Sequence, residues 1–123
     1  MRCVLIESPY GSPDPAIVER NVRYARACLK DSLDRGEAPF ASHLLYTQVY
    51  DDNNHELRKR GIEAGLAIGK LMDKTVVYTD LGISEGMHYG IRAAEEAGRP
   101  IEYRKLPSQE WKIHRYSSGS SNG

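Results

Sequence analysis

Two patterns of hydrophobic positions alternate along the 123-residue chain. Short runs rich in apolar and β-branched residues predict buried strands, at residues 2–7, 38–41, 75–79 and 100–104. Between these runs, apolar residues recur every three or four positions, which predicts helices at residues 15–35, 54–72 and 87–97. Strands that alternate with helices of this length indicate an α/β fold, with a parallel sheet of four to five strands covered on both faces.

Capping residues and glycines define the ends of these elements. Asp14 and Pro15 are typical of a helix start, because aspartate accepts bonds from free amides and proline suits the first helical position. Gly36 and Gly98 are natural helix ends. The glycines of residues 61–69, spaced four apart, predict close packing of that helix on a neighbour. Residues 42–54 are expected to form a long loop with at most a helical turn.

Composition favours one domain over residues 1–112, followed by a flexible tail over residues 113–123 that is rich in Ser, Gly and Asn. Seventeen basic residues balance seventeen acidic ones, which gives no reason to expect nucleic-acid or membrane binding. No apolar run approaches the roughly 20 residues of a membrane span. Residues 2–7 predict a strand, not a signal peptide. Cys3 and Cys28 lie in apolar segments and are expected to be reduced core thiols of a cytoplasmic protein.

Three polar loops follow the predicted strands, and they are expected to meet at one edge of the sheet. They are Ser8–Gly11, Ser42–His43 and Asp80–Gly86. In open parallel sheets, ligands bind beyond the carboxyl ends of the strands. The sequence therefore predicts a ligand pocket built from these loops.

The chemistry of the three loops leaves alternatives open. Ser84, Glu85 and Gly86 open a helix whose free amides suit a phosphate, but Ser84 could equally cap its own helix. His43 could face the ligand or be an ordinary hydrogen-bonded residue. The four histidines have no metal-ligand spacing, so we expect no metal, and no sequence motif indicates a cofactor. Phosphate-binding P-loops, GxGxxG and GxSxG motifs are absent from the sequence.

These residues resemble the nucleoside 2-deoxyribosyltransferase-like superfamily. The similarity lies in the strand that ends in Ser8-Pro9-Tyr10, in residues 75–79, in Ser84-x-Gly86-Met87 and in residues 98–100, and it covers roughly residues 2 to 106. Small uncharacterised phage and actinobacterial members are the most similar. The resemblance implies a flavodoxin-like or Rossmann-like three-layer sandwich, a homodimer or larger homo-oligomer, and a small nucleoside or nucleotide ligand.

The resemblance also implies roles for individual residues. The first loop would meet the base and sugar, and the Ser-x-Gly loop would hold the sugar or its 5′-phosphate. Together with the remaining loop positions, the candidate ligand-binding residues are Ser8, Pro9, Tyr10, Gly11, His43, Asp80, Ser84, Gly86, Met87 and Gly90.

One position departs from the pattern of the superfamily's enzymes. These enzymes carry a nucleophilic glutamate four residues beyond the glycine of the Ser-x-Gly loop, where its carboxylate attacks the anomeric carbon. This chain has Gly90 there, which has no side chain to react. Glu85, Glu63 and Asp80 are candidate replacements. Gly90 could also open space for a larger ligand or a closer backbone approach.

Three functions follow. The first is a nucleoside- or nucleotide-binding protein without glycosidase chemistry. The second is an active N-glycosidase or deoxyribosyltransferase that uses Glu85, Glu63 or Asp80. The third is an interaction protein that keeps the fold without the ligand.

Overall fold

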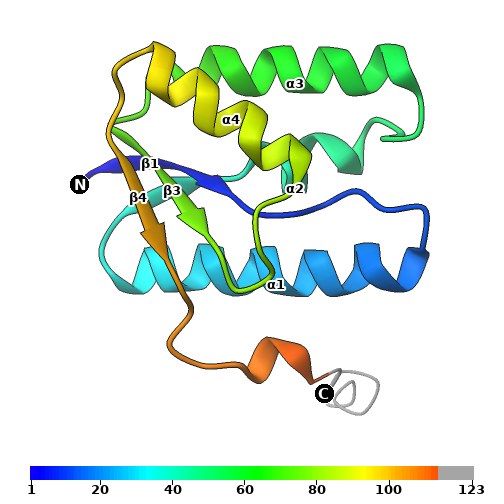
Figure 1. The fold of residues 1–123 in the computed structure, drawn as a ribbon, viewed down its shortest axis with the longest axis horizontal. Coiled ribbons are helices and arrows are strands. Elements are labelled where there is room, and N and C mark those ends of the chain that lie inside the picture. The colour runs from blue at the N-terminus through cyan, green and yellow to red at the C-terminus, as the bar shows by residue number, and fades with distance from the viewer. Residues whose placement is uncertain (114–123) are drawn as a thin grey trace.

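The computed structural model describes residues 1–113 and contains a four-stranded parallel sheet in the order β2-β1-β3-β4 (Figure 1). The strands are β1 (Cys3–Glu7), β2 (Ala38–Phe40), β3 (Lys74–Tyr78) and β4 (Ile101–Arg104). The helices are α1 (Pro15–Asp34), α2 (Ser42–Leu45), α3 (His55–Gly69) and α4 (Glu85–Glu96), with the short 3₁₀ turns η1 (Tyr46–Gln48) and η2 (Glu110–Lys112).

The helices form layers on both faces of this sheet. Helix α1 covers one face, and α3 and α4 lie on the other (Figure 1). The expected Rossmann-like α/β sandwich is therefore confirmed, with four strands in the part of the chain that is described. The predicted tail lies outside the described residues except for Ile113.

The local signals in the sequence set most element boundaries. The side chain of Asp14 accepts a bond from the Ala16 amide, and Asn54 accepts one from the Leu57 amide at the start of α3. Gly36 and Gly98 have φ angles of 84° and 69°, which glycine adopts without strain. Helix α4 begins at Glu85, two residues before the predicted start, because Ser84 supplies the cap.

Residues 42–54 are more ordered than the expected long loop. They contain α2 and η1 before the cap of α3. The hydroxyl of Thr47 donates to the carbonyl of His43 at 2.7 Å, and the Gln48 side chain donates to the carbonyl of Leu44 at 2.9 Å. These local bonds hold two consecutive turns that the hydrophobic pattern is too short to reveal.

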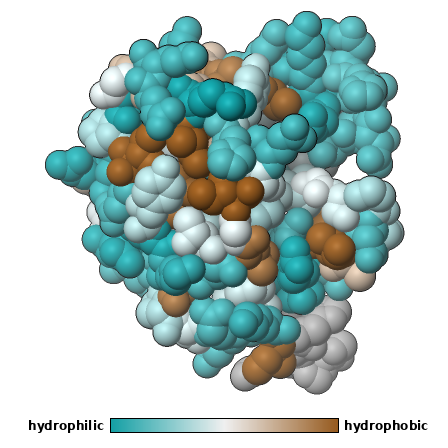
Figure 2. Space-filling view, in the orientation of Figure 1, coloured by the Kyte–Doolittle hydropathy of each residue, from teal (hydrophilic) through white to brown (hydrophobic). Residues whose placement is uncertain are grey.

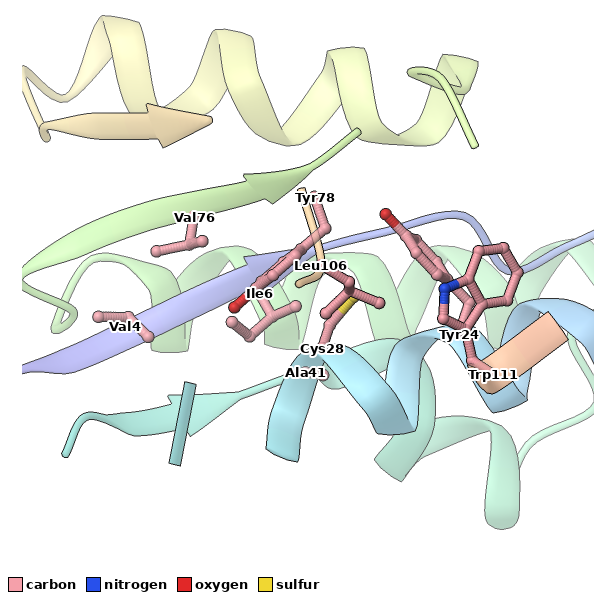
Figure 3. Packing of buried hydrophobic residues seen from close by; sticks show 9 residues of the cluster. All are labelled: Val4, Ile6, Tyr24, Cys28, Ala41, Val76, Tyr78, Leu106 and Trp111. Carbon is pink, nitrogen blue, oxygen red and sulfur yellow. The ribbon is translucent and has the colours of Figure 1, made fainter. Parts of the chain in front are cut away.

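Each face of the sheet has its own hydrophobic core. The larger core packs the sheet on α1 and contains Val4, Ile6, Tyr24, Cys28, Ala41, Val76, Tyr78, Leu106 and Trp111 (Figure 3). The smaller one packs β3 on α4 through Val77, Met87 and Ile91. Figure 2 shows apolar side chains reaching the surface over the region of α4 and β4. The two cores use alternate residues of the strands, as the pleat requires.

The glycines of α3 allow the close packing that their spacing predicts. A Cβ atom on Gly65 would lie 2.9 Å from Oγ of Ser42, and one on Gly69 would lie 3.2 Å from Cδ2 of Leu5. At both positions a side chain would have to displace its neighbour. Helix α3 therefore lies against α2 and β1 through its backbone.

The two thiols lie in different surroundings. Cys28 is fully buried in the larger core, and burial raises the pKa of its thiol. Cys3 is exposed at the start of β1. Both cysteines are free, but the expected core position is confirmed only for Cys28 and is wrong for Cys3, which stands at the exposed first position of its strand.

A buried cluster of charges fastens β4 to the rest of the sheet. Arg104 makes a two-pronged pair with the Glu37 carboxylate at 2.8 and 2.6 Å, and it also donates to Glu102 at 2.7 Å and to the Tyr78 hydroxyl at 3.2 Å. Lys74 pairs with Glu102 at 2.6 Å. The bonds from Arg104 lower the pKa of the Glu37 carboxyl to about 2, so the pair stays ionised at neutral pH.

We expect Arg104→Met to lower the free energy of unfolding by about 2 kcal/mol, because it removes the guanidinium from the largely buried Glu37 carboxylate and leaves Lys74 as the remaining cation of the cluster. Urea denaturation at pH 7 measures this loss. The control is Lys30→Met, which removes an ion pair with Asp34 whose two side chains are 78% and 63% exposed; it should leave stability nearly unchanged. Equal losses in the two variants would contradict the structural role of the buried cluster.

Candidate functional site

A cleft of about 1240 Å³ opens at the carboxyl end of β1, between α3 and α4. The loop after β1, the segment α2–η1, helix α3 and the first turns of α4 all contribute to its walls. The strand order reverses direction between β1 and β3, which is where parallel sheets of this kind bind ligands. The cleft is therefore the leading candidate for the functional site.

Glu7, the last residue of β1, lies on the floor of this cleft. Alternation along the strand points Val4 and Ile6 to the α1 core, and it points Leu5 and Glu7 to the opposite face. The carboxyl group of Glu7 lies against the backbone of Gly90 in α4. Burial raises its pKa from 4.5 to about 8, against the opposing attraction of Arg99. At neutral pH this carboxyl group is therefore mostly protonated.

Ser8 and His43 form a polar pair on the cleft wall. The Oγ of Ser8 and the Nε2 of His43 share a hydrogen bond of 2.7 Å. Burial lowers the pKa of His43 to about 4, so the imidazole is neutral at pH 7. The edge of the Tyr10 ring faces the His43 ring, with 6.5 Å between the ring centroids. His43 thus stands beside the ligand space, and its hydrogen bond fixes its position.

The first turn of α4 borders the cleft with Ser84, Glu85 and Gly86. The Oγ of Ser84 accepts the Met87 amide at 3.3 Å, so this serine does cap its helix. The amides of Glu85 and Gly86 belong to the first turn, which has no acceptors within the helix. Capping and ligand binding are therefore compatible at this position, because the cap leaves these two donors available.

Other side chains add aromatic rings and charges of both signs to the cleft, where Asp52 and Glu56 join the carboxyl groups of Glu7, Glu63 and Glu85. Its lining includes the tyrosines Tyr10, Tyr46, Tyr50 and Tyr89 and the basic residues Arg58, Lys59 and Arg92. Tyr89 is 51% exposed on α4. Aromatic rings can stack on flat ligands, and cations can pair with phosphate or carboxylate groups.

Most of the candidate residues from the sequence come together here. The cleft is lined by Ser8, Tyr10, Gly11, His43, Ser84, Gly86 and Gly90, and also by the carboxylate candidates Glu63 and Glu85. Glu63 and Glu85 are both exposed. Pro9 and Met87 are buried behind the lining, and the amide of Ser84 donates to the Met87 sulfur at 3.3 Å.

Asp80, another candidate from the sequence, is hydrogen-bonded to groups outside the cleft. It accepts bonds from the Tyr24 hydroxyl at 2.7 Å, the Leu106 amide at 3.0 Å and the Gln109 side chain at 3.2 Å. Burial alone would raise the pKa of its carboxyl group, but these bonds hold the pKa below the usual value. Asp80 is outside the cleft lining and fastens the segment after β4 to α1.

Sequence reasoning missed Glu7, since it stood in the strand pattern as an ordinary terminal residue. The available signal was its place: it is the only carboxylate in the predicted first strand, and it directly precedes a loop assigned to the pocket. Tyr46, Tyr50, Arg58 and Lys59 were also missed. The two tyrosines lie in the segment expected to be a long loop, and the two cations lie in the helix predicted at residues 54–72, which was not placed beside the pocket.

Within residues 1–113, no group of three His, Cys, Asp or Glu side chains comes together in a way that could hold a metal ion. In the same part of the chain, no helix combines the length and apolar character needed to cross a membrane.

The fold and the cleft define a Rossmann-like α/β protein with an open cleft at the carboxyl edge of its sheet. More particularly, a family model described as a domain of unknown function (DUF7768) matches residues 2–104, and the chain belongs to this family. Comparison with curated proteins gives no match.

Among solved structures, the chain is similar to a 2-deoxyribosyltransferase from the psychrotolerant bacterium Bacillus psychrosaccharolyticus. The TM-score is 0.63 at 17% sequence identity, and the alignment covers 97% of this chain and 81% of the other. This likeness shows that the two proteins share a fold. The phage and actinobacterial branch and the homo-oligomer stay predictions.

The raised pKa of Glu7 makes stability depend on pH. Between about pH 4.5 and 8 the unfolded chain ionises Glu7 while the folded chain keeps it protonated, so this group makes the fold less stable as pH rises through that window. We expect Glu7→Gln to remove at least about 2 kcal/mol of that decline. Urea denaturation of both proteins at pH 5 and pH 8.5 measures the difference.

The matched control is Glu96→Gln, which changes an exposed carboxylate at the other end of α4. Its stability should follow that of the unmodified chain across the whole pH range. Parallel curves for the unmodified chain and Glu7→Gln would show that the Glu7 carboxyl is not shielded from water.

Proposed function

We propose that the cleft binds a nucleoside or a nucleotide. The observation that carries this proposal is the cleft itself: a space of about 1240 Å³ at the strand-order reversal, with tyrosines, glycines and cations in its lining. A nucleotide offers a flat base, a polar sugar and an anionic phosphate, and this lining contains a suitable partner for each. The fold shared with a 2-deoxyribosyltransferase supports the same class of ligand.

The two ends of the ligand would meet different walls. Tyr10 of the first loop is suited to the base, because stacking on an aromatic ring tolerates any base. The amides of Glu85 and Gly86 at the start of α4 suit a sugar hydroxyl or a 5′-phosphate, with Arg92 on the same helix as a cation. This orientation agrees with the roles that the superfamily resemblance implies.

Binding should depend on Tyr10. With nucleosides and their 5′-monophosphates as probes, we expect isothermal titration calorimetry to detect at least one ligand. Tyr10→Ala should weaken its binding by about 1–3 kcal/mol, the usual value of one stacked base. The control is Tyr103→Ala, an exposed tyrosine on β4 that is 54% exposed and outside the cleft lining. A complete lack of binding by the folded protein would leave the interaction-protein hypothesis as the better account.

A second candidate function is cleavage or transfer of the N-glycosidic bond. The specific observation in its favour is that carboxyl groups line the cleft although position 90 is a glycine. Glycosidic chemistry commonly uses such groups as acids, bases or nucleophiles. Release of free base from a bound nucleoside or nucleotide would distinguish this function from binding alone.

A further inference from the structure

The space beside Gly90 is filled by a carboxyl group that comes from another element. A Cβ atom on Gly90 would lie 2.5 Å from Cδ and 2.9 Å from Oε1 of Glu7, and it would overlap Oε2. Any side chain at position 90 would therefore displace the Glu7 carboxyl group. The position of the Glu7 carboxyl group at the end of β1 therefore requires a glycine at position 90 of α4.

The Glu7 carboxyl group has no hydrogen-bond partner among the described residues, and it lines the cleft. Arg99, which follows α4, interacts with it electrostatically. Other charged or titratable groups that line the same cleft include His43 of α2, Glu63 of α3, and Glu85 and Arg92 of α4. Of these, only Arg99 exerts a resolved attraction on the carboxylate. A partly buried carboxyl group that lines the cleft and is not bonded to the protein is available to a ligand.

Glu7 is more buried than two other carboxylates that line the cleft. Glu63 and Glu85 are exposed, so water can solvate their charges. Glu7 keeps its proton at neutral pH, because burial raises its pKa to about 8. An acid with a pKa near the working pH is well suited to proton transfer.

From this geometry we infer that Glu7 is a catalytic residue, the proton donor in hydrolysis of the N-glycosidic bond of a nucleoside or nucleotide in the cleft. The inference rests on the proposed function. It assigns the chemistry to β1, in place of the carboxylate that α4 lacks at Gly90.

The reaction balances with water as the only co-reactant. The bond between the anomeric carbon and the base nitrogen breaks, and its electron pair stays on the nitrogen, which takes the proton of Glu7. A water molecule forms the new C–O bond at the anomeric carbon, and its proton restores the Glu7 carboxyl group. The products are a free base and a free sugar or sugar phosphate.

The test is incubation of the purified chain with ribonucleosides, 2′-deoxynucleosides and their 5′-monophosphates, followed by chromatography for free base. We expect base release, and a fall of at least about 100-fold in Glu7→Gln, which is the usual contribution of a general acid. Calorimetry should show that this variant still binds the ligand. The rate should fall as the pH rises through about 8, where Glu7 loses its proton.

Two further variants test the role of Glu7 if Glu7→Gln folds poorly. Gly90→Ala leaves Glu7 in the chain but pushes its carboxyl group aside, so base release should fall while ligand binding remains. Glu96→Gln, at the far end of α4 and outside the cleft lining, should keep the full rate.

The outcomes separate this inference from the proposed function. Binding without base release overturns the role of Glu7 and leaves the proposed binding function standing. Base release that persists in Glu7→Gln, or that is lost only in Glu85→Gln or Glu63→Gln, also overturns it. Failure to bind any probe overturns the proposed function itself.

Discussion

The pairing of β1 with β3 is the constraint on which the rest of the structure depends. These two parallel strands form the centre of the sheet, and their residues occupy both cores. Because side chains alternate strictly along a strand, fixing Val4 and Ile6 on the α1 side fixes Glu7 on the other. A shift of one residue would move the carboxyl group into the larger core and an isoleucine into the cleft.

Helices α3 and α4 form the walls of the cleft on the face of the sheet where Glu7 lies. The backbone of α3 comes close to β1 and α2 at Gly65 and Gly69, and α4 comes close to Glu7 at Gly90. Glycine thus has the same role in both helices, which is to admit a neighbour that a side chain would exclude. The cleft lies between two helices that are each held by close backbone contact, and this arrangement favours a rigid site.

Local signals were enough to predict much of the fold. The apolar runs located the four strands, and Asp14 and Gly36 marked the ends of the first long helix because capping acts over only a few residues. The segment of residues 42–54 was harder to predict, since its two short turns depend on side-chain bonds and contacts with α3. The structure of this segment depends on tertiary packing, which the periodicity of apolar residues does not reveal.

The candidate site also contains some features that local sequence signals predict and others that they do not. Ser8, His43 and Ser84 could be proposed from sequence because they follow strands or begin a helix. The bond between Ser8 and His43 could not, because it joins residues 35 positions apart. The surroundings of Glu7 were harder still to predict from sequence, because they depend on Gly90, which makes room for the carboxyl group by having no side chain.

Because only one of the two thiols is exposed, the protein has a single accessible site for thiol labelling. Cys28 is sealed in the core, whereas Cys3 is exposed at the amino end of β1, the edge of the sheet opposite the cleft. At a rise of about 3.3 Å per residue, the strand separates Cys3 from Glu7 by about 13 Å. A maleimide fluorophore or a surface tether therefore attaches at one defined point, and it leaves the mouth of the cleft unobstructed.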